Sequence, residues 1–479
     1  MLLVAREIEI KRLSKLYNSR EAEFLVLYGR RRVGKTFLIR EFFKEKKCQF
    51  FQSTGLQKGS LEKQLEHFSE ALSKVFMEGI LIKTPASWEE AFKILTQFIE
   101  KKPQKSKTII FLDELPWMAS RKSGLLQALD YYWNQHWSMN PKIVLVVCGS
   151  SASWLIKNII YNKGGLHNRC TCEIRLAAFN LSETFLYLKS RGIKLNQQHV
   201  LELYMALGGI PYYLKYVEQG LTASENIQKI LFDKDAPLKD EFKKLFRSLF
   251  RGAEAYIELI ELISKKEGIT RGQIESSSKL SQGGGRLTYR LKQLIQTNFI
   301  DSYISLDKER GEYYKVIDEF CLFYIFWMSS LYGKKLTQDH WLRQIQNPIY
   351  HVWAGYAFES ICHKHAEKII TALGIKTAES ISSWKLSSRK QQNNGAQIDL
   401  LIDRNDDAIT IGEIKYTDKP FVIDKNYQEK LKKKIKIFKE STGTKKQVFL
   451  AIITANGLKS NTYSKEIVDG VVVGSDLFV

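Results

Sequence analysis

The sequence has few cysteines and no long apolar segment. Its six cysteines are scattered, and no two are spaced as C-x-x-C, so the pattern predicts neither a zinc ribbon nor a disulfide framework. The longest apolar run, residues 320–328, is far too short to cross a bilayer. The first residues also lack the apolar core of a signal peptide. We therefore expect a reduced, cytoplasmic protein with no membrane partner.

Acidic residues are outnumbered by basic ones. Lys and Arg total 73 against 52 Asp and Glu, which gives a formal net charge of +21. A chain this basic usually meets a polyanion, and nucleic acid is the first candidate, although a solvated lysine surface is the simpler alternative. The length of 479 residues allows about three domains, each with its own apolar core.

Residues 29–36, Gly-Arg-Arg-Arg-Val-Gly-Lys-Thr, match the Walker A pattern G-x-x-x-x-G-K-[ST] completely. An apolar run, 24–28, precedes them, and a helix-compatible run, 37–43, follows. This context predicts a strand, a phosphate-binding loop and a helix whose dipole favours an anion. Lys35 is predicted to reach the β- and γ-phosphates of ATP, and Thr36 to ligate Mg²⁺. The predicted nucleotide contacts in this region are Gly29, Arg30, Arg31, Arg32, Val33, Gly34, Lys35, Thr36 and Phe37.

Residues 107–112 form a buried-strand pattern that ends in two carboxylates, Asp113 and Glu114. After a P-loop, this is a Walker B signature. We expect Asp113 to hold Mg²⁺ through water, and Glu114 to orient or deprotonate the attacking water. A third strand-like run, 142–148, ends just before Ser150. We assign Ser150 as the sensor of the γ-phosphate, with a simple turn as the alternative.

Four stretches carry a more specific likeness: Arg6-Glu7-x-Glu9, residues 31–36, Leu112-Asp113-Glu114 and residues 208–214. Together they resemble the archaeal-type ATPase family, a branch of the AAA+/STAND P-loop ATPases found in archaea and bacteria. The resemblance implies a parallel α/β core followed by a small helical lid. It also implies that the Gly-x-Pro element lies against the nucleotide, which makes Pro211 a predicted nucleotide contact.

Arg169 follows the third strand-like run. It is either a catalytic arginine finger acting in trans, which requires a homo-oligomer, or a surface arginine. Members of the family often carry Gly-Arg where this chain has Asn168-Arg169. The residues therefore leave both alternatives open.

The pattern changes to short amphipathic segments from residue 251 to residue 318. Apolar residues recur at helical spacing in three segments, and two β-rich runs then flank residues 307–311. Three helices and a hairpin predict a winged helix-turn-helix. Either DNA contact through Arg286, Arg290 and the hairpin, or use as a rigid spacer between proteins, fits this pattern.

Two strand-like runs near the C-terminus flank a turn at residues 404–407. If the hairpin pivots in this turn, Asp399 lies opposite Glu413, and Lys415 shares the face of Glu413. Two acids and a lysine at one place suit Mg²⁺, which binds one or two carboxylates and activates water toward a phosphodiester. We therefore predict Asp399, Glu413 and Lys415 as catalytic residues, the two acids also as metal ligands.

This pattern is similar to the PD-(D/E)xK nuclease superfamily, in which Glu359 would be a further metal ligand supplied by the first helix. The region also resembles the nuclease-like C-terminal domain of uncharacterised function that is often fused to archaeal-type ATPases. A lysine-rich helix, residues 430–436, follows. It is either a track for the phosphate backbone or a solvated helix face.

The sequence thus predicts an α/β protein in four segments. These are a parallel-sheet P-loop ATPase core (1–180), a helical lid (181–250), a winged helix-turn-helix (251–318), and a linker helix with a restriction-endonuclease-like α/β domain (319–479).

We expect ATP and Mg²⁺ as cofactors, double-stranded DNA as partner, and ATP-dependent control of a Mg²⁺-dependent DNA nuclease in defence or mobile-element biology. The alternative is an ATP-switched DNA-binding or signalling protein with a non-catalytic nuclease-like domain.

Overall fold

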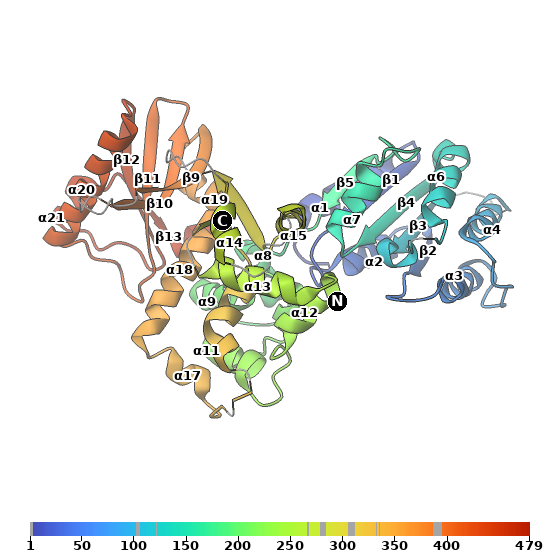
Figure 1. The fold of residues 1–479 in the computed structure, drawn as a ribbon, viewed down its shortest axis with the longest axis horizontal. Coiled ribbons are helices and arrows are strands. Elements are labelled where there is room, and N and C mark those ends of the chain that lie inside the picture. The colour runs from blue at the N-terminus through green and yellow to red at the C-terminus, as the bar shows by residue number, and fades with distance from the viewer. Residues whose placement is uncertain are drawn as a thin grey trace. The chain divides into compact units, whose positions relative to one another are not determined.

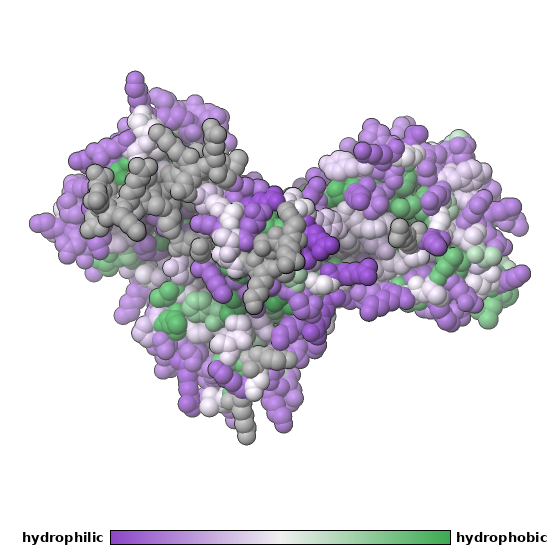
Figure 2. All heavy atoms as spheres, in the orientation of Figure 1, coloured by the Kyte–Doolittle hydropathy of each residue, from purple (hydrophilic) through white to green (hydrophobic). Residues whose placement is uncertain are grey.

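The computed structural model describes residues 3–101, 106–120, 122–265, 268–277, 284–304, 312–331, 333–334, 336–386 and 395–479. The chain forms two compact units, Met1–Ala178 and Phe179–Val479 (Figure 1). None of the described helices is long and apolar enough to cross a membrane. Hydrophilic side chains cover most of the face drawn in Figure 2, in keeping with a chain in which 26% of the residues are charged.

A five-stranded parallel sheet, of order β2-β3-β4-β1-β5, forms the centre of the first unit (Figure 1). β3 and β4 are buried along their whole length, as expected for parallel strands covered on both faces. Because Thr54 pairs with Asp113 and Tyr28 with Gly149, the carboxyl ends of the strands meet along one edge. The predicted parallel α/β class is confirmed. The strands are β1 (Glu23–Tyr28), β2 (Cys48–Thr54), β3 (Lys107–Asp113), β4 (Ile143–Gly149) and β5 (Cys172–Arg175).

Aromatic side chains pack the helices of the first unit against this sheet. Phe68 of α3 contacts Trp88 and Phe92 of α4 edge-on, and all three rings are buried. Such burial of large rings contributes most of the stability of an α/β core. The helices are α1 (Glu7–Asn18), α2 (Lys35–Lys44), α3 (Leu61–Phe76), α4 (Trp88–Lys101), α5 (Leu115–Met118), α6 (Leu125–Gln135) and α7 (Ala152–Leu155).

The second unit begins with short helices. Its first residue, Phe179, donates its N–H to the oxygen of Gly209 at 2.7 Å. A Cβ on Gly209 would lie only 1.8 Å from the backbone oxygen of Phe179, so no other residue fits this contact. The helices are α8 (Leu181–Ser190), α9 (Gln197–Leu207), α10 (Pro211–Leu214), α11 (Ala223–Ile227) and α12 (Glu241–Leu249).

Three helices and a small antiparallel sheet of order β6-β8-β7 come next. Their apolar faces are buried, with Tyr256 and Ile263 in the first helix and Leu291 in the third. The predicted hairpin turn, residues 307–311, lies outside the described residues. The elements are α13 (Ala253–Ser264), β6 (Ile269–Thr270), α14 (Arg271–Ser277), α15 (Gly284–Gln296), β7 (Ile300–Ile304) and β8 (Glu312–Val316).

The chain ends in a mixed five-stranded sheet of order β13-β12-β11-β10-β9. β9, β10 and β11 are antiparallel, whereas β11, β12 and β13 are parallel. Trp384, Phe438 and Leu450 belong to its buried core. The elements of this part are α16 (Glu319–Phe323), α17 (His340–Gln344), α18 (Pro348–Lys364), α19 (Ala366–Ala372), β9 (Ala378–Leu386), β10 (Ala396–Arg404), β11 (Ala408–Lys415), α20 (Lys425–Thr442), β12 (Gln447–Thr454), α21 (Thr462–Ile467) and β13 (Gly470–Val473).

Hydrogen bonds join parts of the second unit that the sequence assigns to different segments. The N–H of Leu181, at the start of the predicted lid, donates to His365 Nε2 at 3.1 Å. The N–H of Trp341 donates to Gln228 Oε1 at 2.7 Å. The predicted lid and the C-terminal region therefore pack as one compact unit, and the boundaries between the segments stay predictions.

Candidate nucleotide site and a second carboxylate site

The P-loop follows β1 and ends where α2 begins at Lys35. Its residues Gly29, Arg32 and Gly34 have positive φ angles of 153°, 75° and 95°. Gly29 has a second constraint, because a Cβ there would lie 2.2 Å from the backbone oxygen of Leu176. This curvature lets successive backbone N–H groups face one anion at a helix N-terminus, which is the arrangement that binds phosphate.

The Lys35 ammonium is buried inside the loop. Its Nζ donates to the backbone oxygens of Gly29 and Arg30 at 2.9 and 3.1 Å. Burial lowers the pKa of Lys35, while the neighbouring Cys148 and Glu114 oppose that shift. An anionic phosphate would favour the charged ammonium, so the position of Lys35 suits its predicted role.

Thr36 and Asp113 meet across the edge of the sheet. Thr36 Oγ1 donates to Asp113 Oδ2 at 2.9 Å, and the Asp113 carboxylate is buried. Cys148 Sγ lies 2.8 Å from Asp113 Oδ1, and Gln52 Nε2 lies 3.5 Å from Asp113 Oδ2. A hydroxyl and a carboxylate side by side are oxygen ligands that Mg²⁺ accepts. The two residues predicted to hold Mg²⁺ therefore fit that ion.

Glu114 and Ser150 form a second pair at the same edge. The backbone N–H and the Oγ of Ser150 donate to Glu114 Oε2 at 2.9 and 3.0 Å. Glu114 has φ 50° and ψ 47°, a left-handed conformation that costs free energy in a residue with a side chain. Because β4 lies between β1 and β3, its end brings Ser150 between the P-loop and Glu114. Ser150 thus fixes the carboxylate predicted to act on water.

Arg6 is a residue whose role sequence reasoning missed, although its motif was noted. It is buried in a left-handed conformation with φ 66°. Its guanidinium donates to the backbone oxygens of Val33 in the P-loop at 3.2 Å and of Ala177 at 2.8 Å. Arg6 therefore ties the P-loop to the last residues of the first unit. The contact joins residues far apart in sequence, so spacing could not reveal it.

The remaining predicted nucleotide contacts have different surroundings. Arg30 and Val33 are buried, whereas Phe37 is exposed. The Arg31 guanidinium lies over the Trp117 ring, 5.9 Å from its centroid. Arg169 is exposed in the loop after α7, a position open to a neighbouring chain. Pro211 belongs to the second unit, and its contact with the nucleotide stays a prediction.

A second group of charged side chains lies on the C-terminal sheet. β10 and β11 pair with Leu400 opposite Gly412, and continuing this register places Asp399 opposite Glu413, as predicted. Both carboxylates are buried. Asp399 Oδ2 accepts the N–H of Ile414 at 3.0 Å. Burial raises the pKa of Asp399, and the neighbouring Glu413 raises it further.

Three donors surround the Glu413 carboxylate. Lys415 Nζ lies 2.9 Å from Oε1, and the Tyr427 hydroxyl donates to the same oxygen at 2.6 Å. Lys434 Nζ, from α20, contacts Oε2. Burial alone would raise the pKa of Glu413, but Lys434 and Lys415 outweigh it and lower that pKa. Sequence reasoning assigned Lys434 only to a lysine-rich face, because helical spacing did not show which lysine turns inward.

Glu359 lies close to this group of charges, because its carboxylate, after those of Glu413 and Asp399, raises the pKa of Lys415. It lies on α18, with Oε1 4.0 Å from His363 Nε2. In the described part of the chain, no group of three or more His, Cys, Asp or Glu side chains is arranged to hold a metal ion. The roles of Asp399, Glu413 and Glu359 as carboxylate ligands for Mg²⁺ therefore stay predictions.

The fold and the first site together define a P-loop ATPase domain. Residues 3–217 match the family described as an ATPase domain found predominantly in Archaea. The chain therefore carries an archaeal-type ATPase domain, and this part of it is an ATP-binding and ATP-hydrolysing enzyme.

Relatives extend this similarity along the chain. An uncharacterised protein of Methanocaldococcus jannaschii is 26% identical over 422 residues, which cover 87% of this chain and 88% of that protein. An uncharacterised ATP-binding protein of the same organism is 45% identical over 49 residues, 10% of this chain and 83% of that protein. The Walker-type ATPase of Pyrococcus abyssi superposes with a TM-score of 0.48 at 20% identity, over 68% of this chain and 96% of that one.

Proposed function

We propose that ATP binding and hydrolysis in the first unit control a Mg²⁺-dependent DNA nuclease in the second. The observation that carries the nuclease is the convergence of Asp399, Glu413 and Lys415 on one antiparallel pair of strands. Two buried carboxylates on one face repel each other, and a divalent cation between them would relieve this repulsion.

In the nucleotide site, each side chain has a separate task. Lys35 neutralises charge on the β- and γ-phosphates from inside the loop. Thr36 and Asp113 supply oxygen ligands for Mg²⁺, which would neutralise the developing phosphate charge. Glu114, held by Ser150, orients the attacking water and accepts its proton. The exposed Arg169 would complete the site of a neighbouring copy in a homo-oligomer.

In the proposed nuclease site, Asp399 and Glu413 would hold Mg²⁺, which activates water toward a phosphodiester. The Lys415 ammonium, next to Glu413, would orient that water or stabilise the charge developing on the scissile phosphate. Tyr427 fixes the Glu413 carboxylate through its hydroxyl. Lys434 adds a second cation beside the same carboxylate.

Several features support DNA as the substrate. The elements α13, β6, α14, α15, β7 and β8 follow the order of a winged helix-turn-helix, and Arg286 on α15 is exposed. Lys430, Lys433 and Lys439 are exposed on α20. Exposed cations of this kind bind phosphate backbones without sequence preference and in a salt-dependent manner.

One observation favours a non-catalytic alternative. Glu413 is already neutralised by Lys415 and Lys434, so its negative charge is balanced without a metal ion. A site of this kind also serves as a buried structural network in a DNA-binding or signalling protein.

The test is plasmid nicking by the full chain with Mg²⁺, with and without ATP. The wild type is compared with Asp399→Asn, which removes one ligand charge, and with Lys35→Ala, which disables the P-loop. Asp403→Asn is the matched control, because Asp403 lies on the same strand but pairs with the Lys446 ammonium. We expect nicking to be lost in Asp399→Asn, retained in Asp403→Asn, and no longer responsive to ATP in Lys35→Ala.

Cleavage that survives Asp399→Asn would exclude the proposed nuclease site. Absence of cleavage by the wild type, together with measurable ATP hydrolysis, would instead support the non-catalytic alternative.

A further inference from the structure

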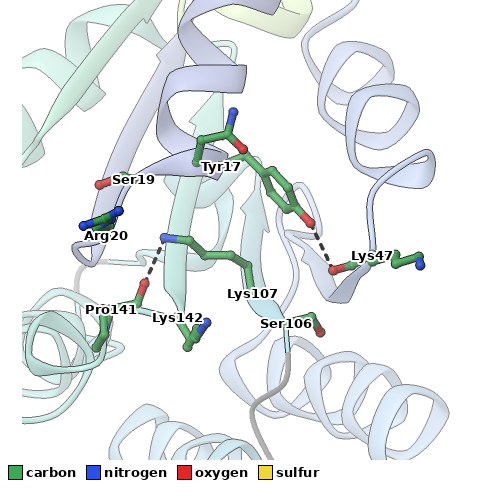
Figure 3. A pocket seen from close by; sticks show the side chains of 9 residues that line it. Tyr17, Ser19, Arg20, Lys47, Ser106, Lys107, Pro141 and Lys142 are labelled. Carbon is green, nitrogen blue, oxygen red and sulfur yellow. Dashed lines mark hydrogen bonds between the residues drawn. The ribbon is translucent and has the colours of Figure 1, made fainter.

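A pocket of about 500 Å³ lies in the first unit, at the amino ends of its strands (Figure 3). The P-loop, Asp113 and Ser150 all lie at the opposite, carboxyl ends. The pocket is therefore separate from the nucleotide site. Its described lining residues are Tyr17, Asn18, Ser19, Arg20, Lys47, Ser106, Lys107, Pro141 and Lys142.

Four basic residues belong to the lining of this pocket. Arg20, Lys47, Lys107 and Lys142 contribute to its lining, and the described lining residues include no Asp or Glu. Cations that share one cavity repel one another, and an anion in the cavity would relieve this cost. Burial lowers the pKa of Lys107; the nearby Glu23 opposes this shift, and Lys142 adds to it to a smaller extent.

Lys107 is built into the floor of the pocket. The residue is buried, and its Nζ donates to the backbone oxygens of Pro141 at 2.8 Å and of Glu21 at 3.2 Å (Figure 3). An ammonium has three N–H donors. These two carbonyl groups accept two of the N–H donors. Among the described residues no other acceptor is found for Lys107 Nζ, so the third donor can serve a ligand. Burial of an ammonium is costly, and an anion would offset this cost.

The walls are also fixed by hydrogen bonds. The Tyr17 hydroxyl donates to the backbone oxygen of Lys47 at 3.0 Å, which joins the end of α1 to the segment before β2 (Figure 3). Ser19 Oγ accepts the N–H of Glu21 at 3.1 Å and so shapes the turn that carries Arg20. These two hydrogen bonds therefore fix the backbone that carries Lys47 and Arg20.

We propose that this pocket binds a phosphate-bearing anion. Phosphate carries more than one negative charge and offers several acceptor oxygens, which suits the buried Lys107 ammonium and the other basic residues of the lining. The phosphate belongs either to a small polyphosphate or to the backbone of a nucleic acid. The proposal does not depend on the nuclease, since every residue involved lies in the first unit.

The experiment uses the full chain carrying Lys35→Ala, so that the P-loop cannot account for binding. Inorganic tripolyphosphate is titrated by calorimetry, and a fluorescent DNA duplex by anisotropy, both at low salt without Mg²⁺. The test variant is Arg20→Glu/Lys142→Glu, two exposed positions in the pocket. The control is Lys93→Glu/Lys163→Glu, two exposed positions outside it that change the net charge equally.

We expect the pocket variant to lose at least about tenfold in affinity while the control changes less than about twofold, because phosphate binding needs the local donors and not only the net charge. A loss in the tripolyphosphate arm identifies a small anion, and a loss in the duplex arm alone identifies the nucleic-acid backbone.

Lys107→Met, which keeps the length of the side chain, should weaken the same arm. Equal behaviour of the pocket variant and the control in both arms would overturn the proposal.

Discussion

The Glu413 carboxylate is buried yet contacts two ammonium groups and a phenol hydroxyl. In water such a contact contributes little, but inside the protein each cation strongly favours the ionised carboxylate. A divalent cation that binds Glu413 must therefore compete with Lys434. Lys434 acts on the proposed metal site without being a ligand.

Replacing Lys434 with Met should tighten divalent-ion binding by about tenfold, because it removes one competing cation from the carboxylate. The affinity for Mg²⁺ or Mn²⁺ would be measured by calorimetry on the full chain. Lys433→Met is the matched control, since Lys433 is the neighbouring residue on α20 and is exposed. Equal affinities in the two variants would show that Lys434 does not compete with the ion.

The free energy of unfolding should depend on pH because of Glu202, which lies on α9. Burial raises the pKa of Glu202 to about 7, and the nearby Asp418 adds to this. The pKa of a glutamate in the unfolded chain is about 4.3. Between this pH and about 7, the folded chain keeps the proton on Glu202 while the unfolded chain loses it, so the free energy of unfolding falls as the pH rises. Glu202→Gln cannot ionise. Its unfolding free energy relative to wild type should rise by up to about 2 kcal/mol between pH 5 and pH 8.

Urea denaturation of the two proteins at both pH values measures this difference. Glu218→Gln is the control, because the Glu218 side chain is 52% exposed and paired with Lys229. A difference between wild type and Glu202→Gln that does not change with pH would contradict the prediction.

At the scale of elements, replacement by alanine should have opposite effects on stability at two glycines of the second unit. Gly209→Ala would place a Cβ 1.8 Å from the backbone oxygen of Phe179, so we expect a loss of about 3 kcal/mol or more. Gly355 lies within α18 with open space around its Cβ position. Gly355→Ala should therefore stabilise the protein by about 0.5–1 kcal/mol through helix propensity.

Thermal unfolding of both variants tests this prediction. A neutral Gly209→Ala would mean that the turn after α9 can move away from Phe179.

Elements whose signals are local could be predicted from the sequence. The P-loop, the Walker B strand and the β10–β11 register depend on neighbouring residues, and the structure brings Thr36 to Asp113 and places Asp399 opposite Glu413. The contacts of Lys434 and Arg6 could not be predicted. Each joins elements that are distant along the chain, and only the packing of α20 or of the chain before α1 decides them.

At the scale of the whole molecule, the chain between the two units is short and held at both ends. Leu176 donates its N–H to the oxygen of Tyr28 at 2.8 Å, and Ala177 accepts from Arg6. Phe179 is bonded to Gly209. Ala177 is hydrogen-bonded within the first unit, and Phe179 is hydrogen-bonded within the second. Ala178 is the one residue between them. A change at the P-loop therefore has a short covalent path to the second unit.

Insertion of Gly-Ser-Gly after Ala178 should leave ATP affinity within about threefold of wild type, since the phosphate-binding residues Lys35, Thr36 and Asp113 lie in the first unit. It should abolish the effect of ATP on DNA binding or cleavage, because a flexible linker cannot transmit a change in backbone position. The same insertion after Gly220, in an exposed turn, is the control. Unaltered ATP dependence after the Ala178 insertion would exclude this path.

The left-handed backbone of Glu114 has a consequence for how this protein can change over generations. Asparagine adopts this conformation more easily than glutamate, so Glu114→Asn would lower the backbone cost while removing the carboxylate predicted to act on water. Natural selection for stability alone would therefore favour loss of the glutamate. Copies of this protein that carry asparagine at this position would be ones that still bind ATP but no longer depend on hydrolysing it.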